Sequence, residues 1–263
     1  MQLSGISGKA AIVTGAAQGI GEGVARALAA EGALLVLADR NGPLLEQICA
    51  DLQSGGATVV AVETDLADQE QVLALVERCV ELHGRVDLLV NVAGIFRAAP
   101  VLELSITDYD MVQAVNTRAV FLCTQAAARH MMQQRSGSVV TIASNAALIP
   151  RVQQSAYCTS KAAVAHLMRC FALELAPYGI RCNSVLPGAA DTPMVQQLRA
   201  TLRPGDADET VVGSLEKFRN GIPLGRLASV EQLANAVLFL LSDQANHITM
   251  QDLVVDGGGA LGV

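Results

Sequence analysis

Residues 9–21 read K-A-A-I-V-T-G-A-A-Q-G-I-G, an apolar run that ends in closely spaced glycines. The run is short and uninterrupted, which predicts a buried β-strand followed by a turn. Gly15, Gly19 and Gly21 follow a G-x-x-x-G-x-G pattern, and residues without a Cβ let a turn approach a pyrophosphate closely. A helix expected over 19–31 would add its N-terminal N–H groups. The stretch therefore predicts a dinucleotide site, with simple tight-turn packing as the alternative.

The same alternation of short strands and longer helices continues along the chain. Including the first run, which covers 9–15, the strands are expected at 34–39, 58–65, 87–94, 138–144, 180–188 and 252–258. Most of these runs are apolar throughout, as is typical of parallel strands that are covered on both faces. Between them, helices long enough for right-handed crossovers are expected at 19–31, 42–54, 68–83, 107–134 and 155–178. We therefore predict an α/β fold: one Rossmann-like, doubly wound domain over 1–263, with a seven-stranded parallel sheet and helices on both faces.

Only residues 189–228 break this rhythm. They contain P-G-D-A-D-E at 204–209 and N-G-I-P-L-G at 220–225, and both stretches favour loops. We expect this segment to leave the sheet and to form a substrate lid.

Composition excludes several classes of protein. The chain has 263 residues, of which 51% are hydrophobic and 16% charged, so disorder is not expected. Its net charge of −7, its scattered basic residues and its lack of Trp argue against nucleic acid as a partner. Charged residues and glycines interrupt every long apolar stretch, so we expect neither a membrane span nor a signal peptide.

Cysteine and histidine residues do not suggest a metal or disulfide framework. The six cysteines lie far apart without C-x-x-C spacing, which favours buried free thiols in a reducing cytoplasm. The four histidines, His83, His130, His166 and His247, show no paired metal-ligand spacing. No metal site is predicted.

Acidic and small residues at the predicted strand ends refine the cofactor prediction. Asp39 ends the second strand, where a carboxylate binds ribose hydroxyls and repels a 2′-phosphate, so NAD is preferred over NADP. Arg40 could soften that preference, and Gln18, beside Ile20 in the glycine turn, supplies no basic charge. Asp39 could instead only cap its strand.

Two further strand ends belong to the same expected crevice. Asp65 and Leu66 are placed to meet an adenine edge, although Asp65 could equally be a solvated turn residue. In N-V-A-G (91–94), the small-residue loop of Asn91, Ala93 and Gly94 would line the crevice or simply end the strand.

The stretch S-A-Y-C-T-S-K (155–161) places Tyr157 and Lys161 on one face of a helix. Ser144 ends the fifth strand and Asn116 lies on the long preceding helix. Each residue alone has an ordinary interpretation as a cap, a helix hydrogen-bonder or a surface pair. All four in register with the cofactor elements predict a catalytic site.

With these motifs, P-G (187–188) and the terminal V-D-G-G (255–258), nearly the whole chain resembles the short-chain dehydrogenase/reductase family. The resemblance implies that Tyr157 is the base that removes the hydroxyl proton of an alcohol. A free phenol has a pKa near about 10, so Lys161 and the nicotinamide charge are expected to favour its phenolate.

The resemblance implies further roles. Lys161 would also hold the nicotinamide ribose, Ser144 would donate a hydrogen bond to the substrate oxygen, and Asn116 would keep a water that leads to Lys161. Pro187, Gly188 and Thr192 would contact the cofactor. Gln251 and the G-G-G-A-L-G-V tail would lie at the interface of a homotetramer. The chain departs from the family's usual N-N-A-G at Val92, which leaves the bracing of the middle strands in doubt.

The family resemblance also suggests a substrate. Stretches such as I-F-R (95–97), T-I-A-S-N-A-A-L-I-P-R (141–151) and F-R-N-G-I-P-L-G-R-L-A (218–228) are similar to those of family members that make catechols for siderophores. Such an enzyme oxidises a carboxylated cyclohexadiene diol with NAD. Arg97, Arg151 or both would bind the carboxylate, unless they are surface loop residues. Met194 and Val195 would add apolar lid contacts or simply pack in a helix or the core.

Two alternatives remain open from the residues. A 3-oxoacyl thioester reductase of the same fold would use NADPH, against which Asp39 argues. A dinucleotide-sensing protein without turnover could dispense with Tyr157 or Lys161, yet both are present.

Overall fold

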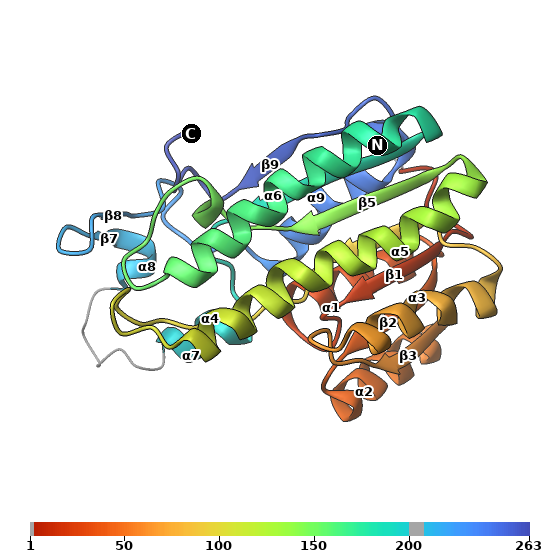
Figure 1. The fold of residues 1–263 in the computed structure, drawn as a ribbon, viewed down its shortest axis with the longest axis horizontal. Helices are drawn as coiled ribbons and strands as arrows, with labels where there is room; N and C mark the ends of the chain where they lie inside the picture. The colour runs from red at the N-terminus through yellow and green to blue at the C-terminus, as the bar shows by residue number, and fades with distance from the viewer. Residues whose placement is uncertain (1–2, 200–207) are drawn as a thin grey trace.

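A computed structural model describes residues 3–199 and 208–263 of the chain (Figure 1). Its main sheet has seven parallel strands in the order β3-β2-β1-β4-β5-β6-β9, which confirms the predicted sheet. The order reverses between β1 and β4, so a crevice opens there at the carboxyl ends of the strands. The strands are β1 (Ala10–Thr14), β2 (Leu34–Asp39), β3 (Val59–Glu63), β4 (Leu88–Asn91), β5 (Gly137–Ile142), β6 (Ile180–Pro187) and β9 (Asp252–Val255).

Polar caps set where several helices begin. Asn41 accepts a hydrogen bond from the Leu44 N–H at the start of α2, and Asp68 accepts two N–H bonds at the start of α3. Ser229 forms a capping box with Gln232 at the start of α9. The larger helices are α1 (Gly19–Ala30), α2 (Gly42–Ser54), α3 (Gln69–His83), α4 (Ile106–Gln113), α5 (Ala119–Gln134), α6 (Ser155–Leu175) and α9 (Val230–Leu241).

The structure differs from the sequence prediction in two helices. The helix expected over 107–134 is divided, because a π-helical segment (Ala114–Arg118) separates α4 from α5. The sequence did not predict helix α9, although Ser229 caps its start and most of its residues are apolar. This helix belongs to the crossover from β6 to β9, where the sequence interpretation includes only the excursion over 189–228 and no helix.

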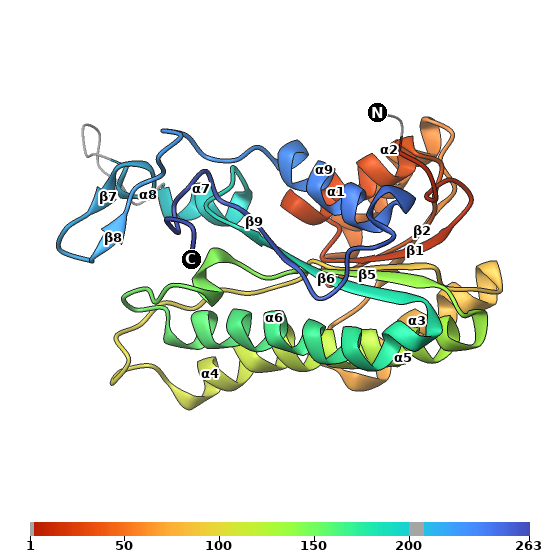
Figure 2. The same ribbon diagram turned by 90° about the horizontal axis from the view of Figure 1, so that it is seen from above.

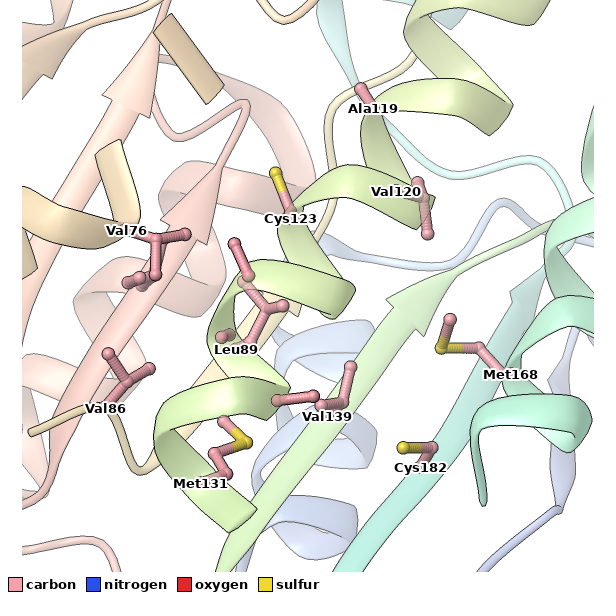
Figure 3. Packing of buried hydrophobic residues seen from close by; sticks show 14 of the residues in the cluster. Val76, Val86, Leu89, Ala119, Val120, Cys123, Met131, Val139, Met168 and Cys182 are labelled. Atoms are coloured by element: carbon pink, nitrogen blue, oxygen red, sulfur yellow. The ribbon is translucent and has the colours of Figure 1, made fainter. Parts of the chain in front are cut away.

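The helices form one layer on each side of the sheet (Figure 2). Helices α1, α2 and α9 cover one face, and α3, α5 and α6 cover the other. On the second face, Leu89 and Val139 of the sheet pack beneath Cys123 and Met131 of α5 (Figure 3). Burial of a large aliphatic side chain stabilises by about 1.5–3 kcal/mol, so these two cores fix the sheet on which the site stands.

The described residues between β6 and α9, 188–199 and 208–229, lie outside the main sheet. They contain α7 (Pro193–Arg199), α8 (Glu209–Val212) and a small hairpin of β7 (Gly213–Ser214) and β8 (Arg219–Asn220), which lie together at one end of the molecule (Figure 2). Residues 204–207 of the predicted P-G-D-A-D-E loop lie outside the described residues.

The cysteines only partly match the expectation of buried thiols. Cys49, Cys79, Cys123 and Cys182 are buried, but Cys158 is partly buried and Cys170 is exposed on α6. Cys170 thus lies on the exposed side of α6, whose buried side includes Met168 and Ala172. Among the described residues, no helix combines the length and the apolar character that crossing a membrane requires.

Candidate active site

The carboxyl ends of the parallel strands enclose a cavity of about 430 Å³. It follows the crevice where the strand order reverses, the position at which open α/β sheets bind ligands. Of the residues predicted from the sequence, the cavity is lined by Gly15, Gln18, Gly19, Ile20, Gly21, Asp39, Arg40, Asp65, Leu66, Ala93, Gly94, Arg97, Ser144, Tyr157, Lys161, Pro187, Gly188, Thr192 and Met194. It also takes in Met111 and Val115, which no motif had marked.

The glycine turn is shaped by two close approaches. Gly15 has a φ of +67°, and a Cβ there would lie 2.7 Å from the Ala93 Cα. A Cβ on Gly21 would lie 2.0 Å from the Gly15 carbonyl oxygen. Only glycine fits both positions, so the turn stays open in front of the first N–H groups of α1. This cradle has the shape and the donors that fit the pyrophosphate of a dinucleotide.

Asp39 joins the glycine turn to the end of β2. Its carboxylate accepts hydrogen bonds from the N–H of Ala17 at 3.2 Å and from the N–H of Asn41 at 3.0 Å. The carboxylate also lines the cavity, while Arg40 beside it is exposed. Both alternatives considered for Asp39 are therefore compatible with its contacts: it braces the strand end and it faces the crevice.

The ends of β3 and β4 contribute unequally. Asp65 and Leu66 line the cavity, and Leu66 is buried. Asn91 does not line it: its amide is buried and donates to the hydroxyls of Thr124 and Thr141, each at 3.2 Å. Asn91 thus braces β4 against its neighbours. Val92 packs against the apolar core, and its N–H donates to the Thr14 hydroxyl at 3.1 Å.

Ser144, Tyr157 and Lys161 meet at one end of the cavity. Lys161 is only 4% exposed, and its Nζ donates to the Ile142 carbonyl oxygen at 2.8 Å. Nζ lies 5.7 Å from the centroid of the Tyr157 ring, which packs edge-on against Phe96 at a centroid distance of 5.3 Å. The helical spacing predicted a shared face for Tyr157 and Lys161, and both lie beside Ser144, two residues after the end of β5.

Burial dominates the electrostatics of this pair. It lowers the pKa of Lys161 to about 8 and raises the pKa of Tyr157, an effect that interaction with Ser144 partly offsets. The sequence had led us to expect a phenol whose ionisation is favoured by Lys161. In the structure, desolvation raises the pKa of the phenol, and the opposing contribution comes from Ser144 rather than from Lys161.

Asn116 occupies the π-helical segment rather than a regular helix. Its Oδ1 accepts the Ile95 N–H at 2.8 Å, and its Nδ2 donates to the Ile95 carbonyl and the Ser160 hydroxyl. A Cβ on Gly94 would lie 3.4 Å from both Asn116 Oδ1 and Lys161 Nζ. Gly94 therefore leaves a space between the amide and the ammonium. π-helical turns often occur at functional sites.

A second cavity of about 170 Å³ continues from the first past Ser144 and Tyr157. Arg151 and Arg219 both line it, whereas Arg97 lies on the larger cavity and pairs with Asp108 at 3.4 Å. Met194 lines both cavities. Arg219 was missed in the sequence because, although it is a basic residue within the predicted lid, nothing in its spacing shows that it faces Tyr157.

The far wall of this second cavity comes from the end of the chain. The Asp256 carboxylate accepts hydrogen bonds from Asn145 Nδ2 at 3.1 Å, from the Gly258 N–H at 2.9 Å and from the Ala260 N–H at 2.7 Å. Asn145 directly follows Ser144. Across the described residues, no cluster of three or more His, Cys, Asp or Glu side chains could hold a metal ion.

The chain that carries this glycine turn and the site of Ser144, Tyr157 and Lys161 matches a family model over residues 15–259. The model is described as enoyl-(acyl carrier protein) reductase. The chain belongs to the short-chain dehydrogenase/reductase family and is an oxidoreductase of that family. Dehydrogenases of this family use nicotinamide dinucleotide cofactors.

The chain is 44% identical to the 2,3-dihydro-2,3-dihydroxybenzoate dehydrogenase of Bacillus subtilis (strain 168), with 100% of both chains covered. It is 42% identical to the enzyme of the same name from Escherichia coli (strain K12), with 97% of this chain and 98% of that one covered. Among solved structures, levodione reductase is 33% identical with a TM-score of 0.89, covering 98% of this chain and 99% of the other.

Proposed function

We propose that the protein oxidises 2,3-dihydro-2,3-dihydroxybenzoate to 2,3-dihydroxybenzoate with NAD, as a step of catechol siderophore biosynthesis in the cytoplasm. The observation that carries the proposal is a partly buried cation, Arg151, in the cavity that adjoins Ser144 and Tyr157. A guanidinium there binds a ring carboxylate while a ring hydroxyl reaches the phenol. The names of the two relatives described above agree with this substrate.

Each catalytic side chain has a distinct task in this proposal. The Ser144 hydroxyl donates to the substrate oxygen and holds it beside Tyr157. The Tyr157 phenolate accepts the hydroxyl proton, and the Lys161 ammonium stabilises the phenolate. Asn116 holds a water in the space beside Gly94, through which the proton reaches solvent by way of Lys161.

The cofactor residues are those that line the larger cavity. The glycine turn would hold the pyrophosphate, Asp39 the adenosine ribose, Asp65 and Leu66 the adenine, and Lys161 the nicotinamide ribose. When bound, the nicotinamide supplies the acceptor for the hydride that leaves the carbinol carbon. The resulting ketone enolises to the aromatic catechol, which makes oxidation the downhill direction.

Specificity for NAD follows from the charge at the ribose position. The Asp39 carboxylate lines the cavity and would repel a 2′-phosphate; Arg40 lines the same cavity, but it is exposed, so solvent screens its charge. This argues against an NADPH-dependent 3-oxoacyl thioester reductase, although one relative, at 35% identity, is a 3-oxoacyl-[acyl-carrier-protein] reductase of Thermotoga maritima.

The same family membership supports a homotetramer. Exposed apolar side chains gather on α4 to α6, including Tyr109, Phe121 and Leu173, and others lie in the tail at Leu261 and Val263. Faces of this kind are typical of subunit contacts. Residues 189–228 are proposed to act as the substrate lid, because Met194 of α7 lines both cavities.

The test is NADH formation, followed by the absorbance of the reduced nicotinamide, with 2,3-dihydro-2,3-dihydroxybenzoate and either NAD or NADP. We expect NAD-dependent turnover that yields 2,3-dihydroxybenzoate. Binding of the cofactor without turnover of this diol would reject the substrate assignment.

A further inference from the structure

The smaller cavity has a charge arrangement that the proposed base and cofactor residues do not explain. Arg151, from the loop before α6, and Arg219, from β8, come from distant parts of the chain and line the same cavity of about 170 Å³. Both guanidinium groups are partly buried. Burial lowers the pKa of each, and the charge of Arg219 lowers the pKa of Arg151 further. Two cations held this close repel one another unless an anion joins them.

The protein supplies little to neutralise them. Within 3–199 and 208–263, neither Arg151 nor Arg219 forms a salt bridge, in contrast to Arg97, which pairs with Asp108. Asp256 faces the same cavity, but its oxygens already accept the three hydrogen bonds described above.

Two more acids lie near Arg219 and raise its pKa, but each has another contact. Glu209 pairs with Lys217 at 2.6 Å, and Asp208 accepts the Thr210 N–H at 3.0 Å at the start of α8. Asp208 and Glu209 therefore reduce the repulsion between Arg151 and Arg219, but neither acid lines the cavity. The guanidinium groups of Arg151 and Arg219 are therefore still able to bind an anion that enters beside Ser144 and Tyr157, which line the same cavity.

The hairpin fixes where Arg219 can lie. Ser214 pairs with Arg219 and Gly213 with Asn220 in an antiparallel register. Gly213 has a φ of +85°, and a Cβ there would lie 2.6 Å from the Arg219 carbonyl oxygen. Any other residue at Gly213 would therefore be strained and would press against β8. The close contact between Gly213 and β8 holds the Arg219 backbone at the cavity wall.

We propose that Arg219 is a specificity-determining residue, and that it binds the substrate carboxylate together with Arg151. Two planar guanidinium groups that converge on one small cavity match the two oxygens of a carboxylate. This inference rests on the proposed function, since it assigns a second cation to the same substrate. Arg219 selects the carboxylated ring and does not take part in proton transfer.

The test compares two ligands that differ only in the carboxylate. The affinities of 2,3-dihydroxybenzoate and catechol are measured by calorimetry on the full-length protein with bound NADH. KM and kcat are measured for the carboxylated diol and for 3,5-cyclohexadiene-1,2-diol. Arg219→Leu should weaken binding of 2,3-dihydroxybenzoate about tenfold or more and leave catechol affinity within about twofold, because charge-assisted hydrogen bonds are lost only with the carboxylate. KM for the carboxylated diol should rise more than kcat falls.

Matched variants separate this role from a general loss of charge or of folding. Arg226→Leu removes an exposed cation from the same excursion that lines neither cavity and bonds only to Leu227 and Gln232 among the described residues, so it should leave both affinities unchanged. Arg219→Lys should restore part of the preference, because it keeps the charge but not the planar fork. Unchanged thermal unfolding would show that Arg219→Leu still folds.

The outcomes distinguish the inference from the function on which it rests. If the wild-type protein oxidises the carboxylated diol and Arg219→Leu keeps the full preference for 2,3-dihydroxybenzoate, the inference is wrong and the function stands. If the wild-type protein prefers 2,3-dihydroxybenzoate through Arg219 but does not oxidise the diol, the function is wrong and the carboxylate site stands. If the wild-type protein neither distinguishes the two ligands nor oxidises the carboxylated diol, both are rejected.

Discussion

The Nζ atom of Lys161 lies 5.7 Å from the centroid of the Tyr157 ring and is anchored at 2.8 Å to the Ile142 carbonyl oxygen. The hydrogen bond to Ile142 holds the Lys161 ammonium beside the Tyr157 ring, and the ammonium does not bond directly to the phenol. Burial works against both charged forms, since it raises the pKa of the phenol and lowers that of the amine. Burial therefore favours the neutral form of each group, and the proposed role of Tyr157 as a base would require a further positive charge beside the phenol.

Replacement of Tyr157 by Phe removes the phenolic oxygen and keeps the ring. The edge-on contact with Phe96 should survive, so the fold and the affinity for NAD should change little. Turnover should fall by roughly 10²–10⁴-fold, because the general base is lost. Steady-state rates and NAD titrations on the same preparation check this, and activity near the wild-type level would remove Tyr157 as the base.

Burial of Lys161 should make stability depend on pH. The pKa of Lys161 falls from its ordinary value of 10.5 to about 8, so between these values the unfolded chain holds a proton that the folded chain has released. The free energy of unfolding therefore rises with pH from about 8 toward 10. Relative to Lys161→Met, the wild-type protein should gain up to about 3 kcal/mol across this window. Urea denaturation at pH 7.5 and 9.5 measures the difference; parallel curves would contradict it.

Gly15 and Gly56 offer a matched pair for the cofactor cradle. Both have positive φ, +67° and +87°, but a Cβ on Gly15 would meet the Ala93 backbone, while nothing lies within 4 Å of one on Gly56. Both alanine variants should lose about 1 kcal/mol or more of stability from backbone strain. Only Gly15→Ala should also weaken NAD binding, as measured by fluorescence titration. Equal NAD affinities in the two variants would argue against the cradle.

Asp39 should decide between the two nicotinamide dinucleotides. Asp39→Asn keeps an oxygen that can accept the Ala17 N–H and removes the charge, so the ratio of kcat/KM for NAD over NADP should fall by about tenfold. Asp39→Ala removes both the charge and the acceptor, and it should lower the ratio as well as the stability. A ratio unchanged in both variants would place recognition of the 2′-hydroxyl elsewhere.

The sequence predicted the sheet because strand periodicity and strand-end chemistry are local. Most of the predicted cofactor residues line one cavity since they all follow carboxyl ends of parallel strands. Asn91 does not, because a strand-end position alone does not show whether an amide turns inward to Thr124 or outward. The π-helical segment at Asn116 depends on contacts with the Ile95 backbone that no helical periodicity records. Arg219 faces Arg151 only through tertiary folding of the hairpin.

The hydrogen bonds of Asp256 to Asn145, Gly258 and Ala260 have a practical consequence for handling the protein. They connect the turn at 256–260 to Asn145, which follows Ser144. A label or fusion partner attached after Val263 would therefore disturb the position of Ser144. Affinity tags for purification are better placed at the N-terminal end, where Ser4 bonds to Asp243 and Gln244 and lines neither cavity.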